Sequence, residues 1–250
     1  MRIVVCVKQV LNPHGLSVNR KAEKVFVNRE EYLIDPASKA ALEVAESIKG
    51  AGDEVIAISI GGLRVDEALR EATARGADRS ILIRSDVPLD AFVVANMLAA
   101  AIEKIGNVDL VLCGDRSLDT ACGEVAPRIA AALNRPSILN AVKVEIIDQT
   151  LSAIVHDSDF FKAESQLPAV VSIISEAFTG KYANAWRLID AYKKSDIEIW
   201  NANDLGLGED DLQPRSIKKE DAFPPERQLG TQVKNAKELV AMLKRERIVL

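Results

Sequence analysis

The chain has 250 residues, 48% of them hydrophobic and 28% charged, which is the composition of an ordinary globular protein. Its formal net charge of −5 provides no basic face for phosphates, which excludes a nucleic acid as partner. The sequence has no run of about 18 apolar residues, so we expect no membrane-spanning helix and do not expect a membrane protein.

Strand-like and helix-like segments alternate along the first 175 residues. Short β-branched runs predict strands at residues 2–8, 54–60, 80–84, 109–113 and 169–175. Their near-continuous apolarity is typical of strands covered on both faces, as in a parallel sheet. Helical patterns lie between them at residues 38–50, 65–76 and 90–106, and each ends on a glycine suited to the left-handed position after a helix. The alternation predicts an α/β fold with a doubly wound, mostly parallel sheet.

Two later segments depart from this alternation. Residues 141–156 contain two strand-like runs on either side of Asp148, Gln149 and Thr150, and we expect a hairpin added to the parallel sheet. Residues 179–194 fit a loop followed by a short helix.

Trp186 and Trp200 flank a charged stretch, and each is either a local core anchor or an interface contact.

The last fifty residues have a different character. Residues 201–232 are polar, contain three prolines and show no sustained period. Residues 235–248 then have the pattern of an amphipathic helix, with Asn235 as its cap and Glu238 three residues later. Such a tail packs either on its own domain or on a partner subunit, and the pattern leaves both open.

The turn after the predicted strand at residues 109–113 is the strongest candidate site. Pro127 is tolerated only in the first turn of a helix, which places the next helix start near Cys122 to Glu124. Free N–H groups and the positive end of the helix dipole would face the loop and form a generic anion site. Gly114 would let a ligand approach the backbone closely.

The chemistry of this loop stays open. Asp119 or Thr120 either caps the helix, as in a plain strand-to-helix turn, or bonds a ribose hydroxyl. Neither GxGxxG nor GxxxxGK[ST] occurs, so the loop is not a dinucleotide fingerprint or a Walker loop. The charge of Glu124 would lie beside a bound anion and argues against a tight phosphate site.

Cysteine and histidine placement gives no metal or catalytic site. Cys6, Cys113 and Cys122 are odd in number and lack CxxC spacing, so we expect buried, reduced thiols in a cytoplasmic protein. His14 and His156 are isolated, with no cluster of ligands around them. No residue pattern requires an acid, a base or a nucleophile.

With these residues described, the chain resembles the β subunits of electron transfer flavoproteins over most of its length. The segments that carry the resemblance are "IVVCVKQV", "LIDPASKAALEVAESIK", "ALREATARGADRSILI", "DLVLCGDRSLDTACGEVAPRIAAALNRP" and "KYANAWRLIDAYKKSDIEIWNANDLGL". Asp35 stands where the family usually has Asn. The co-linear order of these segments carries the assignment.

The resemblance implies a Rossmann-like, adenine nucleotide alpha-hydrolase-like fold and an electron carrier rather than an enzyme. An α subunit would hold most of the FAD of a heterodimer. That heterodimer would accept electrons from a flavin dehydrogenase, such as an acyl-CoA dehydrogenase, and pass them to a quinone oxidoreductase or a similar acceptor. The β site would hold AMP, or a second FAD in electron-bifurcating members. It also implies a nucleotide-binding domain at 1–178, a partner-docking loop and helix at 179–200, and an arm on the α subunit at 201–250.

Site residues follow from the same resemblance, position by position. The implied nucleotide-binding residues are Cys6, Asp35, Pro36, Ala37, Ser38, Ile60, Gly114, Asp115, Arg116, Ser117, Leu118, Asp119, Thr120, Ala121, Cys122, Gly123, Glu124 and Val125. The implied docking residues are Tyr182, Ala185, Trp186 and Leu188.

Departures from the family favour the type with a single FAD and AMP. "VLNPHGLSV" replaces the Pro-Asp-Thr run of bifurcating members, and residues 90–96 lack their acidic-Thr motif, although "EVAP" resembles the bifurcating loop. Two rival functions remain. One is a stand-alone nucleotide sensor of the stress-protein type. The other is an ATP-using hydrolase. Such an enzyme needs a Ser-Gly-Gly-x-Asp loop after the first strand, and the segment "VKQVLNPHG" does not contain one.

Overall fold

The computed structural model describes residues 1–85, 89–178, 181–194, 196–217, 219, 222–225, 230–246 and 248. The chain divides into two compact units. The larger comprises Met1–Ser17 and Val25–Lys218, and the smaller comprises Val18–Lys24 and Lys219–Leu250. Among the described helices, none combines the length and the apolarity that crossing a bilayer requires.

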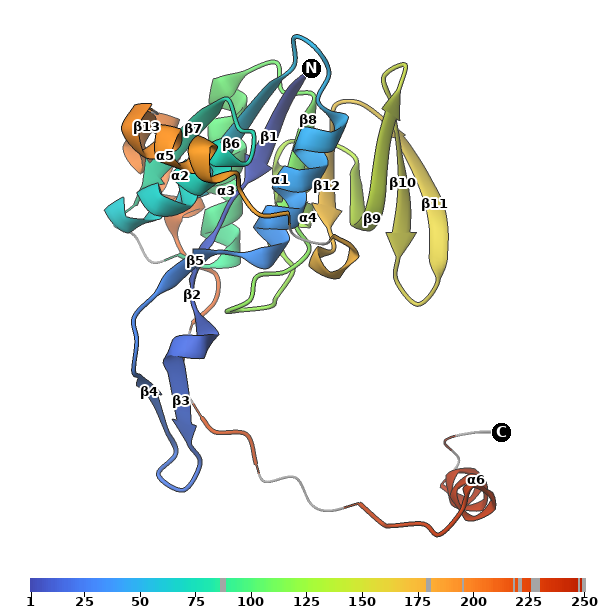
Figure 1. The fold of residues 1–250 in the computed structure, drawn as a ribbon. Helices are drawn as coiled ribbons and strands as arrows, with labels where there is room; N and C mark the ends of the chain where they lie inside the picture. The colour runs from blue at the N-terminus through green and yellow to red at the C-terminus, as the bar shows by residue number, and fades with distance from the viewer. Residues whose placement is uncertain are drawn as a thin grey trace. The chain divides into compact units, whose positions relative to one another are not determined.

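The larger unit is built around one sheet, which has nine strands within the described residues, in the order β11-β10-β9-β12-β8-β1-β6-β7-β13 (Figure 1). The strands are β1 (Arg2–Cys6), β6 (Glu54–Ile60), β7 (Arg79–Arg84), β8 (Leu110–Gly114), β9 (Ser137–Ile147), β10 (Thr150–His156), β11 (Phe160–Gln166), β12 (Ala169–Ile173) and β13 (Ile197–Asn201). The strands from β9 to β13 in this order pair in parallel, and β10 is antiparallel to β9 and β11. The predicted doubly wound, mostly parallel α/β fold is confirmed.

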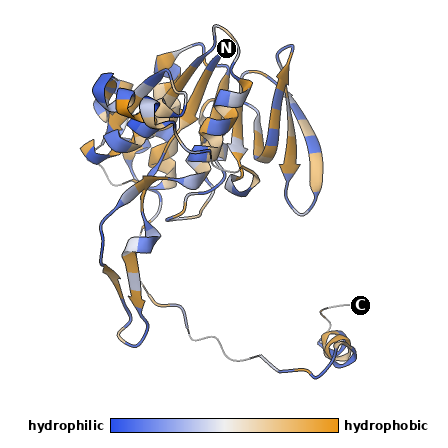
Figure 2. Ribbon diagram, viewed as in Figure 1, coloured by the Kyte–Doolittle hydropathy of each residue, from blue (hydrophilic) through white to orange (hydrophobic). Residues whose placement is uncertain are grey.

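Helices cover both faces of this sheet. Helices α1 (Pro36–Ile48) and α2 (Asp66–Ala74) pack on one face, with strand residues such as Val5 and Leu112. Helices α3 (Ala91–Ile105) and α4 (Val125–Ala132) pack on the other, with residues such as Val4 and Val111. Because successive side chains of a strand point to opposite faces, both sets must be apolar, which explains the continuous apolar runs. Figure 2 shows the hydrophobic colour on these central strands.

The remaining elements of the chain are short. Helix α5 (Ala185–Lys194) packs beside α2. Strands β2 (Gln9–Leu11) and β5 (Tyr32–Ile34) form a small antiparallel sheet, and β3 (Leu16–Asn19) and β4 (Lys24–Val27) form another. Single 3-10 turns lie at Pro13–Gly15, Leu63–Val65, Ser175–Ala177, Ala202–Leu205 and Glu209–Leu212.

Most predicted elements are confirmed, but the short strands β2, β3, β4 and β5 were not predicted. The predicted hairpin is β9–β10, and β11 extends it by a strand that was not predicted. Strand β13 was not predicted either. The left-handed glycine expected after the first helix is wrong: α1 ends at Ile48, Lys49 caps it, and Gly50 donates its N–H to Asp53 instead. Gly76 and Gly106 do have the expected positive φ, at 115° and 70°.

In the smaller unit, helix α6 (Ala236–Arg245) confirms the predicted amphipathic helix. Asn235 accepts the N–H of Glu238 at 3.0 Å, and the Glu238 carboxylate accepts the N–H of Lys234 at 2.8 Å. No residue of α6 is buried, and Leu239 and Val240 are 44% and 48% exposed. Within the predicted docking segment and arm, residues 179–180, 195, 218, 220–221, 226–229, 247 and 249–250 lie outside the described residues. The division of roles between these segments stays a prediction.

Candidate functional site

The candidate site lies at the point of the central sheet where the chain stops adding strands on one side of β1 and begins to add them on the other side. From β1 the chain adds β6 and β7 on one side, and α3 then returns it to β8 on the other side of β1. The carboxyl ends of β1 and β8 therefore meet at the topological switch point, where open α/β sheets bind their ligands. A cavity of about 280 Å³ lies there.

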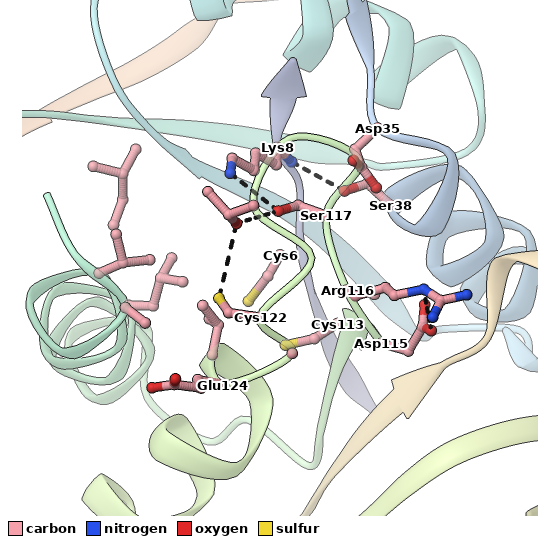
Figure 3. Close-up of a pocket in the computed structure, with 18 of the residues that line it drawn as sticks. Cys6, Lys8, Asp35, Ser38, Cys113, Asp115, Arg116, Ser117, Cys122 and Glu124 are labelled. Carbon is pink, nitrogen blue, oxygen red and sulfur yellow. Dashed lines mark hydrogen bonds and ion pairs between the residues drawn. The ribbon is translucent and has the colours of Figure 1, made fainter. Parts of the chain in front are cut away.

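The structure gathers most of the predicted nucleotide-binding residues around this cavity. Those that line it are Cys6, Asp35, Ser38, Ile60, Gly114, Asp115, Arg116, Ser117, Thr120, Cys122, Gly123, Glu124 and Val125. The others, Pro36, Ala37, Leu118, Asp119 and Ala121, belong to the same segments but do not line it. Figure 3 shows the side chains of Lys8, Ser117, Cys6 and Cys122 close together, whereas Asp115 and Arg116 point toward each other and away from them.

The sequence reasoning missed part of the lining. Val7 and Lys8 follow β1 directly, and Cys113 is the last residue but one of β8. The other lining residues come from the first half of α3 and the two residues before it: Leu89, Asp90, Ala91, Val94 and Leu98. The rule that ligands bind at strand ends could have found Lys8, because it is the first charged residue after the predicted strand. Nothing in the local pattern distinguished the residues of α3 from ordinary core positions.

Asp35 connects the start of α1 to the loop after β8. It is the N-terminal cap of α1 and is only 2% exposed. Its Oδ1 accepts the N–H of Ala37 at 2.9 Å, and its Oδ2 accepts the N–H of Leu118 at 2.7 Å. Next to it, Ser38 Oγ accepts the N–H of Lys8 at 3.0 Å. The start of α1 thus fixes both loops that border the cavity.

A polar network at the edge of the cavity centres on Asp119. Its Oδ1 accepts hydrogen bonds from Lys8 Nζ at 2.6 Å, from Ser117 Oγ at 2.6 Å and from the N–H of Thr120 at 2.8 Å. Partial burial raises the pKa of Asp119, but the bonds from Lys8 and Ser117 outweigh it and hold the pKa below its usual value. The capping alternative is therefore wrong, because Asp119 is used within the loop and α4 has no side-chain cap.

The start of α4 presents free backbone donors. The N–H groups of Gly123, Glu124 and Val125 have no hydrogen-bond partner among the described residues, as expected at a helix start. The concern about the charge of Glu124 is answered by Arg128, whose Nη2 and Nε bond the Glu124 carboxylate at 2.7 and 2.9 Å. The ion pair offsets the carboxylate charge next to these donors.

Asp115 is an incompletely satisfied carboxylate at the cavity. Its side chain is 10% exposed, and its Oδ1 is buried without a hydrogen-bond partner among the described residues. Burial raises the pKa of Asp115. The neighbouring Arg116 bonds Glu176 at 2.9 Å. The other oxygen of Asp115 lies 3.6 Å from Arg116 Nε, so the carboxylate is held by its neighbour in the loop.

The three cysteines all face the cavity as free thiols (Figure 3). Cys6 is half-buried and Cys113 is buried, as expected, but the expectation of burial is wrong for Cys122, which is exposed. The described residues contain no group of His, Cys, Asp and Glu side chains that could hold a metal ion.

The predicted docking residues lie at and before α5. Tyr182 is 98% exposed and Trp186 is 77% exposed, whereas Leu188 is partly covered. Ala185 is the first residue of the helix. Trp200 is different: it packs against the core, and the ammonium group of Lys104 lies 4.4 Å from its ring centroid. Trp200 is therefore a local core anchor.

Comparison with known proteins gives a consistent result. The profile of the electron transfer flavoprotein domain matches residues 24–205. The electron transfer flavoprotein subunit beta of Homo sapiens is 32% identical, over 98% of this chain and 97% of the human protein. The caffeyl-CoA reductase–Etf complex subunit CarD of Acetobacterium woodii is 33% identical, over 83% of this chain and 80% of that protein. The subunit beta of Bacillus subtilis is 30% identical over 91% of each chain.

Proposed function

The chain belongs to the electron transfer flavoprotein family, and from that premise we propose that it works as a β subunit in partnership with an α subunit. The pair forms an FAD-containing heterodimer that carries electrons from a flavin dehydrogenase to a further acceptor. Bound FAD supplies the redox chemistry, and this chain supplies a binding scaffold and a docking surface. It is a carrier subunit rather than an enzyme.

The observation that carries this proposal is the cavity at the switch point, which fits an adenine nucleotide. Ile60, Val94 and Leu98 give it apolar walls suited to a purine ring. The N–H groups at the start of α4 and the ammonium group of Lys8 suit a phosphate.

The size of the cavity favours AMP over a second FAD. Its volume of about 280 Å³ lies just below the range for ligand pockets, about 300–1,000 Å³. A mononucleotide needs less space than a dinucleotide. The alternative of a second FAD, as in bifurcating members, is favoured by one observation, the similarity to a subunit of a caffeyl-CoA reductase–Etf complex.

Two exposed segments supply the partner contacts. The aromatic side chains of Tyr182 and Trp186 are suited to docking a flavin dehydrogenase, such as an acyl-CoA dehydrogenase, because exposed aromatic residues are frequent anchors of interfaces. A quinone oxidoreductase or similar acceptor would take the electrons onward. The apolar face of α6 is suited to packing on the α subunit. The free thiols of all three cysteines support a cytoplasmic location.

Co-purification tests the proposal. The tagged full-length chain, expressed with an electron transfer flavoprotein α subunit, should retain that subunit and a yellow flavin. Leu239→Glu should weaken this retention, because it places a charge on the apolar face of α6. Ala241→Glu adds the same charge on the opposite side of the helix and should retain the α subunit. A colourless chain that ignores the α subunit would instead support the rival, a stand-alone nucleotide sensor.

A further inference from the structure

The floor of the cavity carries two cysteines on neighbouring strands. In the parallel pairing of β1 with β8, Val4 is opposite Val111 and Val5 is opposite Leu112. The next step of this register places Cys6 opposite Cys113. In a parallel pair, opposite residues point to the same face, and the strands lie about 4.8 Å apart. The two sulfur atoms therefore belong to one site, which the proposed nucleotide binding does not require.

The two thiol groups lie side by side in the floor of the cavity. The neighbouring Cys113 thiol and burial raise the pKa of Cys6 well above the ordinary thiol value. Because the thiolate is the reactive form, Cys6 reacts slowly at neutral pH and the pair stays reduced in the absence of an oxidant. Cys6 lines the cavity, so a small molecule that enters the cavity reaches its sulfur.

We propose that Cys6 and Cys113 are a reversible dithiol–disulfide site in the floor of the cavity, oxidised by a small peroxide. The sulfur of Cys6 attacks one oxygen of hydrogen peroxide, the O–O bond breaks, and a sulfenic acid and water form. The sulfur of Cys113 then attacks the Cys6 sulfur and displaces hydroxide, which takes the proton of the Cys113 thiol and leaves as the second water. The two thiols lose two electrons, and the peroxide gains them.

Strand spacing makes such a disulfide reversible. A disulfide needs its two Cβ atoms about 3.5–4.5 Å apart, which is closer than the spacing of neighbouring strands. Closing the bond therefore draws the ends of β1 and β8 together, and strained disulfides are more easily reduced than structural ones. These strand ends lead into Lys8 and Gly114, which border the cavity from its two sides. Oxidation would thus join the two strand ends that border the cavity by a covalent bond.

The test uses the full chain, as isolated with any accompanying subunit, carrying Cys122→Ser so that the exposed thiol does not contribute. After treatment with hydrogen peroxide, thiols are alkylated in denaturant and assigned by peptide mapping in a mass spectrometer. We expect the thiols of Cys6 and Cys113 to disappear together, with their peptides joined and lighter by two hydrogen atoms. Dithiothreitol should restore both. The rate should rise about tenfold per pH unit near neutrality, as the thiolate fraction does.

Single replacements complete the design. Cys6→Ser and Cys113→Ser, each with Cys122→Ser, should abolish the joined peptides; the sheet already accommodates buried serines at positions 59, 80 and 172. The proposal is overturned if the two thiols are lost at different rates with a gain of oxygen and no cross-link. It is also overturned if both stay alkylatable after prolonged peroxide treatment at alkaline pH, where the thiolate fraction is highest.

Discussion

Asp35 Oδ2 lies 2.7 Å from the backbone nitrogen of Leu118, a residue 83 positions further along the chain. The other oxygen of the same carboxylate accepts the N–H of Ala37. One buried side chain therefore satisfies two backbone donors, one at the start of α1 and one in the loop after β8. Only a carboxylate accepts at both of its polar atoms, because an amide has a donor in place of one oxygen.

Asp35→Asn should accordingly leave one of these N–H groups without an acceptor. We expect the free energy of unfolding to fall by about 1–3 kcal/mol, measured by denaturant titration of the full chain. Asp148→Asn is the matched control, since Asp148 is exposed in the β9–β10 turn with a φ of 48°, which Asn tolerates well. Equal stability of the two variants would contradict the role given to Asp35.

Gly114 is required by the close approach of α1 to the end of β8. A Cβ at position 114 would lie 2.5 Å from the Cβ of Ala37 and 3.1 Å from its carbonyl carbon. Gly114→Ala should therefore destabilise the chain by about 1–3 kcal/mol, because α1 must shift away from the sheet. Gly62→Ala provides the control: it has no atom within 4 Å of its Cβ position and should change stability little. Thermal unfolding of the two variants distinguishes them.

Asp90 predicts a pH dependence of stability. Burial raises its pKa, but hydrogen bonds from Val93, Ser216 and Arg215 outweigh burial and lower the pKa to about 2. Because the folded pKa lies below the unfolded value of about 3.9, the stabilisation is complete above pH 4 and is lost as the pH falls towards 2. Solvent screening reduces it to about 1 kcal/mol.

Asp90→Asn tests this dependence. At pH 7 the variant should be less stable than the unaltered chain by about 1 kcal/mol, and the difference should vanish near pH 2. Trypsin should also cut faster after Arg215, because Asp90 Oδ2 holds the N–H groups of Arg215 and Ser216. A stability difference that is the same at pH 2 and pH 7 would show that the carboxylate charge is not responsible.

The sequence predicted the central strands and the candidate loop because their causes are local. The continuous apolar run of β8 and the position of Pro127 both follow from covered strands and helix starts. Strand β13 was missed because it is an edge strand that alternates apolar and polar residues without a buried run. Strand β11 was missed for a similar reason, since most of its side chains are exposed and backbone pairing holds it.

Several features of the site result from contacts between residues that are far apart in the sequence. Lys8 meets Asp119 across 111 positions of sequence, and no local pattern records such a pair. Cys122 was expected to be buried, but it lies in the loop before α4, where residues 121–124 are all exposed. The pairing of Glu124 with Arg128 is local, at helical spacing, and could have been predicted.

The exposed Trp186 should matter for partner docking and not for folding. We expect Trp186→Ala to leave the free energy of unfolding within about 0.5 kcal/mol of the unaltered chain, because its side chain is 77% exposed. The rate of flavin reduction by a partner dehydrogenase, followed by stopped-flow absorbance, should fall about tenfold or more. Phe160→Ala removes an exposed aromatic ring from β11 and should leave that rate unchanged. A rate unaffected by Trp186→Ala would remove this residue from the docking surface.

The central claim is that the crevice between the ends of β1 and β8 holds an adenine mononucleotide in a flavin-carrying heterodimer. Heating the purified complex and quantifying the released nucleotides tests it most directly. We expect one FAD and one AMP for each heterodimer. One FAD without AMP, or two FAD, would contradict the claim.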